Sequence, residues 1–171
     1  MTRQVAQVVA LLSAVALAAG CGQTVDEKGE DMDPLEQLEQ RPRESETETR
    51  YLRALTSFQD RVAEEVGVSW DQTPRRTGMA GCGEPFSGLG GVSFTVRGGT
   101  SADAFDMARW SDVEAIADAV AAEEGFTADK VVLVDEDDHK KVTWIDEHGA
   151  ELEIGAQKAL VPAVYGACVL P

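Results

Sequence analysis

The chain has 171 residues, a formal net charge of -16 and a pI near 4.4. Such acidity argues against a nucleic-acid-binding protein, because neutralising phosphates requires clustered Lys and Arg; we expect no nucleic-acid partner. Once an N-terminal leader and a polar linker are set aside, roughly 120 residues remain, the usual size of one domain.

The first residues have the features of a secretory signal peptide. Arg3 supplies a positive charge, and the run Val5–Ala18 is almost wholly apolar. This run is too short for a membrane span of about 20 residues. A charged start, an apolar middle and a small-residue end are instead typical of an export signal. We therefore interpret residues 1–20 as a lipoprotein signal peptide, on the strength of the residue that follows.

That residue is Cys21, which comes directly after Ala18, Ala19 and Gly20. The pattern resembles the lipobox of bacterial lipoproteins, in which the cysteine sulfur carries diacylglycerol and the cysteine becomes the new N-terminus. Two acyl chains, at roughly 0.8 kcal/mol per buried methylene, are enough for stable attachment. We therefore expect lipidation at Cys21 and attachment to the cell membrane on its extracytoplasmic face. A plain secreted protein with a chance cysteine is the alternative.

Residues 21–44 are predicted to form an acidic flexible tether. They include few apolar residues and no aromatic ones, so they cannot bury enough surface to fold alone. A frayed helical turn around residues 34–40 is the most structure that we expect there. The remaining residues, 45–171, are predicted to form a single globular domain.

The first half of this domain is predicted to contain one long helix and one strand. Apolar residues recur at helical spacing from Ser45 to Val66, and Gly67 followed by an apolar residue is a typical C-terminal cap. Residues 71–91 are rich in Pro, Gly and Arg and are expected to form a loop. Alternating apolar residues then predict a strand at 91–98.

The second half is predicted to contain another helix and several strands. Ser111 followed by Glu114 fits a capping box at a helix start, and Gly125 repeats the glycine stop. The strand-like runs that follow are 130–136, 140–146, 150–157 and 163–170, with a tight turn at 147–149. This order predicts an α+β fold, with an antiparallel sheet of about four or five strands and two helices packed on one face.

Two cysteines remain after lipidation of the first, Cys82 and Cys168. An even pair in an exported protein is expected to form a disulfide, which would stabilise the domain by roughly 4–5 kcal/mol in the chain-entropy model. The alternative is a catalytic thiol at Cys82 with His139 or His148 as its base, since a nucleophilic cysteine needs a base nearby.

No catalytic, cofactor-binding or metal-binding residues are predicted. The glycine-rich stretch 78–91 does not match a phosphate-binding signature and precedes a strand instead of a helix. Residues 135–139 could offer carboxylates to a hard cation, but a solvated turn between two strands is the simpler interpretation. The sequence contains neither a His-Glu-x-x-His motif nor a Gly-x-Ser-x-Gly elbow.

The three tryptophans, Trp70, Trp110 and Trp144, remain to be explained. In a domain with few aromatic residues, the usual role of tryptophan is to fill the core at helix–sheet junctions. The alternative is that one or two of them line an apolar groove between helices and sheet, suited to an acyl chain or a peptide.

Several of these features occur together behind the lipobox: Trp70, the loop containing Cys82, and the ending Gly166–Cys168. Their order resembles the LppA-like lipoproteins of mycobacteria and related actinobacteria, and the resemblance covers roughly residues 62–170. It implies a membrane-anchored α+β domain with a disulfide and an uncharacterised biochemical role. The family offers no catalytic residues that could be assigned to this chain.

Together these observations predict a non-enzymatic, lipid-anchored extracytoplasmic protein that binds a protein, peptide or lipid partner at the cell envelope. Two alternatives come from other classes. One is a cell-envelope hydrolase that uses carboxylates alone, which requires two carboxylates converging in a cleft. The other is an acyl-chain or lipid carrier, which requires an enclosed apolar cavity of several hundred cubic ångströms.

Overall fold

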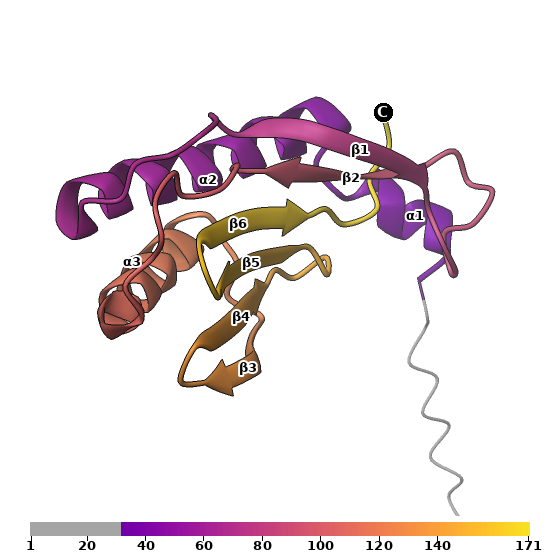
Figure 1. The fold of residues 1–171 in the computed structure, drawn as a ribbon. Helices are drawn as coiled ribbons and strands as arrows, with labels where there is room; N and C mark the ends of the chain where they lie inside the picture. The colour runs from indigo at the N-terminus through magenta and orange to yellow at the C-terminus, as the bar shows by residue number, and fades with distance from the viewer. Residues whose placement is uncertain (1–31) are drawn as a thin grey trace, which may run out of the picture. The chain divides into compact units, whose positions relative to one another are not determined.

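A computed structural model describes residues 32–171 (Figure 1). These residues form one compact unit with its own core. The predicted signal peptide and the lipidation residue Cys21 lie outside the described residues. The elements follow in the order α1 (Pro34–Glu39), α2 (Glu44–Val66), β1 (Arg75–Gly81), β2 (Val92–Arg97), the short 3-10 helix η1 (Met107–Arg109), α3 (Trp110–Glu123), β3 (Asp129–Glu136), β4 (His139–Ile145), β5 (Glu151–Ala156) and β6 (Leu160–Tyr165).

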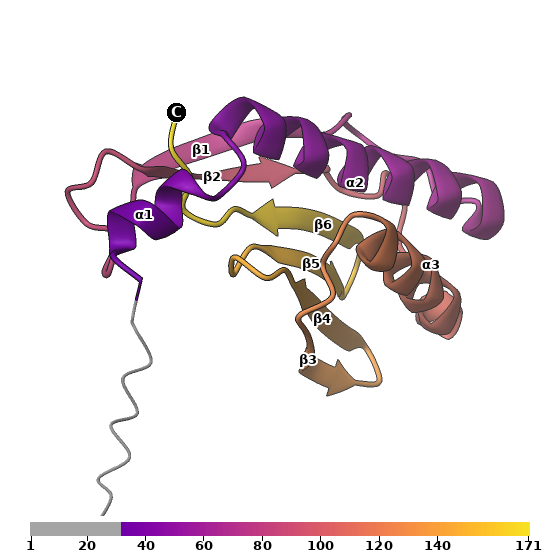
Figure 2. The same ribbon diagram turned by 180° about the vertical axis from the view of Figure 1, so that it is seen from behind.

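The strands form one six-stranded antiparallel sheet in the order β1-β2-β6-β5-β4-β3. Helices α2 and α3 lie over the same face of this sheet (Figures 1 and 2), and none of the described helices lies over the opposite face, which we name the open face. The α+β class and the antiparallel sheet are confirmed. The predicted number of strands, four or five, was slightly low.

The extra strand is β1, within the stretch expected to be a loop. It lies at the edge of the sheet and pairs only with β2, from Arg75 opposite Arg97 to Gly81 opposite Val92. All its residues except Arg76 are exposed. Because neither face of the strand is buried, its sequence lacks the alternation of apolar and polar residues by which strands are recognised.

One hydrophobic core lies between the helices and the covered face of the sheet. Helix α2 contributes Tyr51, Leu55, Phe58 and Val62, all fully buried. The sheet contributes Phe94, Val96, Val142, Leu152 and Ile154. These residues are the alternate positions of their strands, so the residues between them face the open side. Gly67 ends α2 with a φ of 82°, as its place after the apolar stripe predicts.

Helix α3 ends as predicted but begins differently. Gly125 adopts a φ of 80°, and the Phe126 N–H donates to the Ala121 carbonyl at 2.8 Å, which closes the helix. At the start, Trp110 is already helical and no side chain caps the helix. The capping box predicted at Ser111 is therefore wrong. The Asp106 carboxylate instead caps the preceding turn η1, accepting a hydrogen bond from the Ala108 N–H at 3.0 Å.

The segment before α2 is more ordered than a tether. Pro34 starts α1, and the Asp33 carboxylate caps it by accepting from the Leu35 N–H at 2.9 Å. Leu38 is 1% exposed, and the Arg41 guanidinium donates to the Cys168 carbonyl oxygen at 2.8 Å. The C-terminal half of the stretch predicted as a tether therefore packs on the domain, because contacts to the C-terminal segment supply the burial that its own composition lacks.

Cys82 and Cys168 form the predicted disulfide, with their Cα atoms 5.7 Å apart. It joins the loop after β1 to the C-terminal segment, where Val92 and Val169 form an isolated β-bridge. A Cβ atom on Gly91 would lie 2.8 Å and 2.9 Å from the two sulfurs. A glycine is therefore required beside the disulfide.

Strand β6 begins earlier than predicted, before Pro162. Its proline is tolerated because the Pro162 carbonyl accepts from the Gly98 N–H at 3.0 Å, one residue past the end of β2. The backbone of Pro162 thus faces the residue just beyond the end of β2, outside the paired part of the β2–β6 ladder. The N–H that proline lacks is therefore not needed for a hydrogen bond of that ladder. The predicted turn at 147–149 is present between β4 and β5, with Gly149 at a φ of 84°.

Candidate functional site

The disulfide decides between the two interpretations of Cys82. Its sulfur is bonded to Cys168, so Cys82 has no thiol to act as a nucleophile, and the alternative of a catalytic cysteine is wrong. His139, at the start of β4, and His148, in the β4–β5 turn, consequently have no nucleophile of this kind to activate.

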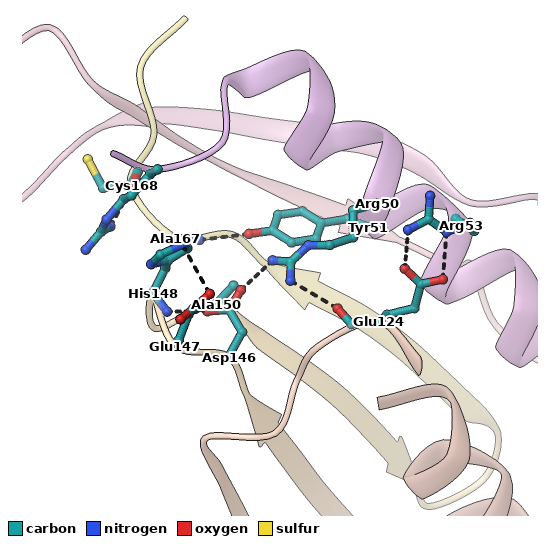
Figure 3. Close-up of polar contacts among 11 residues, drawn as sticks. Arg50, Tyr51, Arg53, Glu124, Asp146, Glu147, His148, Ala150, Ala167 and Cys168 are labelled. Atoms are coloured by element: carbon teal, nitrogen blue, oxygen red, sulfur yellow. Dashed lines mark hydrogen bonds and ion pairs between the residues drawn. The ribbon is translucent and has the colours of Figure 1, made fainter. Parts of the chain in front are cut away.

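Two of the buried polar residues, Glu124 and Asp146, belong to a cluster of charged groups between α2, the end of α3 and the β4–β5 turn (Figure 3). The Arg50 guanidinium lies between two acceptors: it pairs with the Asp146 carboxylate, and its Nη1 donates to the Glu124 carbonyl oxygen at 3.0 Å. The other oxygen of Asp146 accepts from the backbone N–H groups of His148 and Ala150, at 2.9 Å and 2.8 Å. Every side-chain oxygen of Asp146 is therefore used.

Two further pairs extend the cluster. The Arg53 guanidinium donates to both Glu124 carboxylate oxygens, at 2.7 Å and 2.5 Å. The Tyr51 hydroxyl accepts from the Ala167 N–H at 3.3 Å, so it ties α2 to the C-terminal segment near the disulfide. Figure 3 shows both contacts beside Arg50.

The electrostatics of this cluster favour a fixed, structural role. Burial lowers the pKa of Arg50, but its hydrogen bond to Asp146 and the attraction of nearby charges together outweigh burial and raise that pKa. Burial also raises the pKa of the Tyr51 phenol, which keeps it neutral. Each carboxylate is bound by an arginine, so both already have a charged partner within the domain. The cluster joins segments distant in sequence and leaves no group free for a substrate.

The three tryptophans are held separately. The Trp70 indole N–H donates to the Gln59 carbonyl at 3.1 Å, and its ring centroid lies 6.1 Å from that of Phe58. The indole N–H groups of Trp110 and Trp144 donate to carboxylates of α3, at 3.1 Å and 2.7 Å. The structure thus does not bring the three rings together in one groove.

A small hollow between the end of α2 and η1 has a volume of about 150 Å³ and is lined in part by Val66, Phe105 and Arg109. This is below the range of about 300–1,000 Å³ typical of ligand pockets, and none of the three tryptophans lines it. It gives no support to the hypothesis of an acyl-chain carrier.

The open face of the sheet offers a larger site. Two hollows lie side by side on it and share Arg97 and Val161; their volumes are about 420 Å³ and 140 Å³. Glu153 is the one carboxylate among the residues that line them, and it pairs with Lys141 at 2.9 Å. The Tyr165 hydroxyl lies 3.5 Å from the other Glu153 oxygen. This face combines a hollow with exposed apolar and cationic side chains.

Sequence reasoning did not identify this face as a site. Arg97 ends a correctly predicted strand, but Arg75 is in the unrecognised β1, within the stretch that was expected to form a loop. The alternation of 150–157 could have placed Glu153 and Gly155 opposite the buried positions, but only strand pairing brings Arg75, Arg97 and Lys141 to one face.

Neither a metal site nor a membrane span occurs in the part of the chain that the structure describes. Among residues 32–171, no group of three or more His, Cys, Asp and Glu side chains is placed to hold a metal ion. In the turn predicted as solvated, the Asp135 carboxylate pairs with Lys140 at 2.5 Å. No described helix is both long enough and apolar enough to cross a membrane.

Comparison with known proteins gives matches to one family and to two solved structures. Residues 20–171 match the family LppA, described as a lipoprotein confined to pathogenic Mycobacterium. A crystal structure of the putative lipoprotein LppA from Mycobacterium tuberculosis is similar, with a TM-score of 0.53, 14% identity, and coverage of 80% of this chain and 83% of that one. A DUF4853 family protein from Actinomyces odontolyticus matches with a TM-score of 0.50, 19% identity, and coverage of 78% and 72%. No curated protein matches the chain.

Proposed function

The chain belongs to the LppA lipoprotein family, and from this premise we propose that it is a non-enzymatic, lipid-anchored protein of the cell envelope that binds a partner through the open face of its sheet. The partner is a protein, peptide or lipid. The observation that carries the proposal is the open face itself: a sheet covered by helices on one side only, with a hollow of about 420 Å³ on the other.

The anchor is supported by the sequence around Cys21. The family match begins at residue 20, immediately before this cysteine, and the small residues before it fit a lipobox. We propose that the mature protein begins at Cys21 with a diacylglycerol on its sulfur, and that the domain projects from the extracytoplasmic face of the membrane.

Replacing Cys21 by Ala tests the anchor. The variant should lose its membrane attachment and appear in the soluble fraction after a carbonate wash, and intact-mass measurement of the wild type should give the mass of two or more acyl chains. Continued sedimentation of Cys21→Ala with washed membranes would contradict lipid anchoring.

In the described part of the chain, neither the open face nor the buried cluster offers the pair of free carboxylates that a hydrolase needs, which supports a binding role for the open face. Glycosidase-type hydrolysis needs two carboxylates flanking the substrate. The two hollows of the open face are lined by one, Glu153, which is paired with Lys141. The buried carboxylates Asp146 and Glu124 are both bound by arginines.

Partner binding is tested with two variants that each introduce one carboxylate. Val161, 38% exposed, lies between the two hollows, and Val161→Glu should abolish the binding of envelope components that co-purify with the wild type. Ala63 is exposed on α2, and Ala63→Glu should leave the same components bound. Identical sets recovered with both variants would show that the open face is not the binding surface.

A further inference from the structure

The open face carries a group of cationic side chains, although the chain as a whole is strongly negative. The whole chain has a formal charge of -16. The residues that line the two hollows nevertheless include four cationic side chains and a single carboxylate, Glu153. We name these four residues the basic strip: Arg75, Arg97, Lys141 and Lys158.

Two of these cations lie where a sheet normally avoids like charges. Arg75 is directly opposite Arg97 in the β1–β2 ladder, so both side chains leave the sheet on the same side, about 5 Å apart at the backbone. Like charges placed opposite each other destabilise a sheet. Among the described residues, neither guanidinium forms an ion pair.

The adjacent residue Arg76 shows that this region can neutralise an arginine. Its side chain points to the covered face, where it pairs with Glu44 at 2.6 Å and Glu48 at 3.1 Å and lies over the Phe94 ring. In the loop before β1, the Asp71 carboxylate accepts from the Thr100 N–H at 2.7 Å instead of pairing with either arginine of the facing pair. Arg75 and Arg97 are thus left without a counter-charge while their neighbour has two.

The strip continues away from this pair across the sheet. Val161 and Lys158 line the same hollow as Arg97. Lys141 also lines this hollow, but it is already paired with Glu153. Lys158 is exposed, and in the described part of the chain it has no ion-pair partner. The strip therefore offers an uncompensated guanidinium pair at one end, an apolar middle and a lysine beyond it.

We infer that the basic strip binds a phosphate monoester, with the phosphate group between Arg75 and Arg97 and the organic part over Val161 towards Lys158. This rests on the proposed function and names the chemical class of its ligand. A phosphate monoester has three terminal oxygens and up to two negative charges, so it can accept from two guanidinium forks at once, whereas a carboxylate has two oxygens and a single charge. Arginine also suits phosphate better than lysine does, because its donors form a rigid planar fork.

The test uses residues 22–171 with the disulfide intact, since these contain the whole compact unit of 32–171. Glycerol phosphate is titrated at low ionic strength and followed by calorimetry and by amide chemical shifts. Saturable binding should move the amides of β1, β2 and β6. Arg97→Gln should weaken it roughly tenfold or more, the effect of losing a hydrogen-bonded charge.

Three controls decide the geometry. Arg61→Gln removes an arginine that pairs with Glu123 on the helices and should leave the affinity unchanged. Arg97→Lys keeps the charge but removes the fork, and it should also weaken binding. Glycerate, which carries a single carboxylate in place of the phosphate, should bind more weakly than glycerol phosphate. Equal effects of Arg61→Gln and Arg97→Gln, or no saturable binding of any phosphate probe, would overturn the inference.

A second arm identifies the source of the phosphate. Vesicles of phosphatidylcholine with and without phosphatidic acid, whose headgroup is a phosphate monoester, are mixed with the same unlipidated protein. Binding that requires phosphatidic acid and is lost in Arg97→Gln assigns the ester to a lipid headgroup, whereas binding of glycerol phosphate alone assigns it to a soluble ligand. If Val161→Glu loses its partners while every phosphate probe fails, the inference is wrong and the proposed function stands.

Discussion

The two sides of the sheet differ in whether their arginines are paired with carboxylates. On the covered face, Arg50 and Arg76 are each bound by carboxylates. On the open face, Arg75 and Arg97 lie opposite each other with no carboxylate bound to either among the described residues. The covered face is arranged for the stability of the fold alone. The open face retains electrostatic repulsion between two arginines that no carboxylate of the described residues neutralises.

The largest effect is expected at the disulfide, which supports the fold and lies outside the two hollows of the open face. Replacing both Cys82 and Cys168 by Ala should lower the free energy of unfolding by roughly 4–5 kcal/mol, because the open chain gains loop entropy. Urea unfolding measures this. Reduction of the wild type should produce a comparable loss, and the reductant should have no further effect on the double variant.

Next in size is the buried carboxylate. Asp146 is 2% exposed, and Asp146→Ala would leave Arg50 and two backbone N–H groups without their acceptor. We expect a loss of roughly 3–5 kcal/mol, the usual result of breaking a buried ion pair on one side. The control is Asp135→Ala, at an exposed pair with Lys140, which should cost at most about 1 kcal/mol. Similar losses in the two variants would contradict the structural role of the cluster.

A smaller effect is expected at Tyr51. Tyr51→Phe removes the acceptor of the Ala167 N–H and should cost roughly 1 kcal/mol, whereas Tyr165→Phe, on the open face, should cost less. The pH dependence sharpens the comparison. Burial raises the pKa of Tyr51 in the folded state, so its contribution is complete below the unfolded-state pKa of about 10 and is lost as pH rises through the folded-state value. Tyr51→Phe should therefore flatten the fall in stability at alkaline pH.

The smallest change has the opposite sign. Arg75→Gln removes one of two facing charges on the open side and should raise the free energy of unfolding by roughly 0.2–1 kcal/mol, the usual range of cross-strand pair effects. The gain should shrink in high salt, which screens the repulsion. A loss of stability in this variant would mean that Arg75 supports the fold, and the contrast between the two faces would fail.

Prediction from sequence succeeded where a periodic pattern is enforced by one buried side. Helix α2, strand β2 and the turn between β4 and β5 were recognised in this way, and the glycines that end both long helices adopt the positive φ that makes them stops. Strand β1 was missed because all its residues except Arg76 are exposed. A helical turn was expected where α1 lies, but not its packing on the domain, because a single deeply buried side chain, Leu38, gives no periodic pattern.

The polar cluster and the basic strip could not be predicted from the sequence, because both depend on contacts between residues far apart in the chain. Arg50 and Asp146 are 96 residues apart, and Tyr51 and Ala167 are 116 apart, so no spacing rule connects them. The strip depends on which strands are neighbours, and β6 lies between β2 and β5 although it is last in the chain. The cysteine pair was predictable because export and an even count constrain it without any geometry.

The bond between Arg41 and the Cys168 carbonyl has a mechanical consequence. The chain enters the domain through α1, and the Glu44 N–H also bonds to the Leu170 carbonyl at 2.9 Å. Because Cys168 is covalently joined to Cys82, a force applied at Met32 is transmitted through these hydrogen bonds to the C-terminal segment. From there the disulfide transmits it to the loop after β1. A force applied through the N-terminal segment would therefore act first on these two hydrogen bonds and the disulfide, and only afterwards on the packing of α2 against the core.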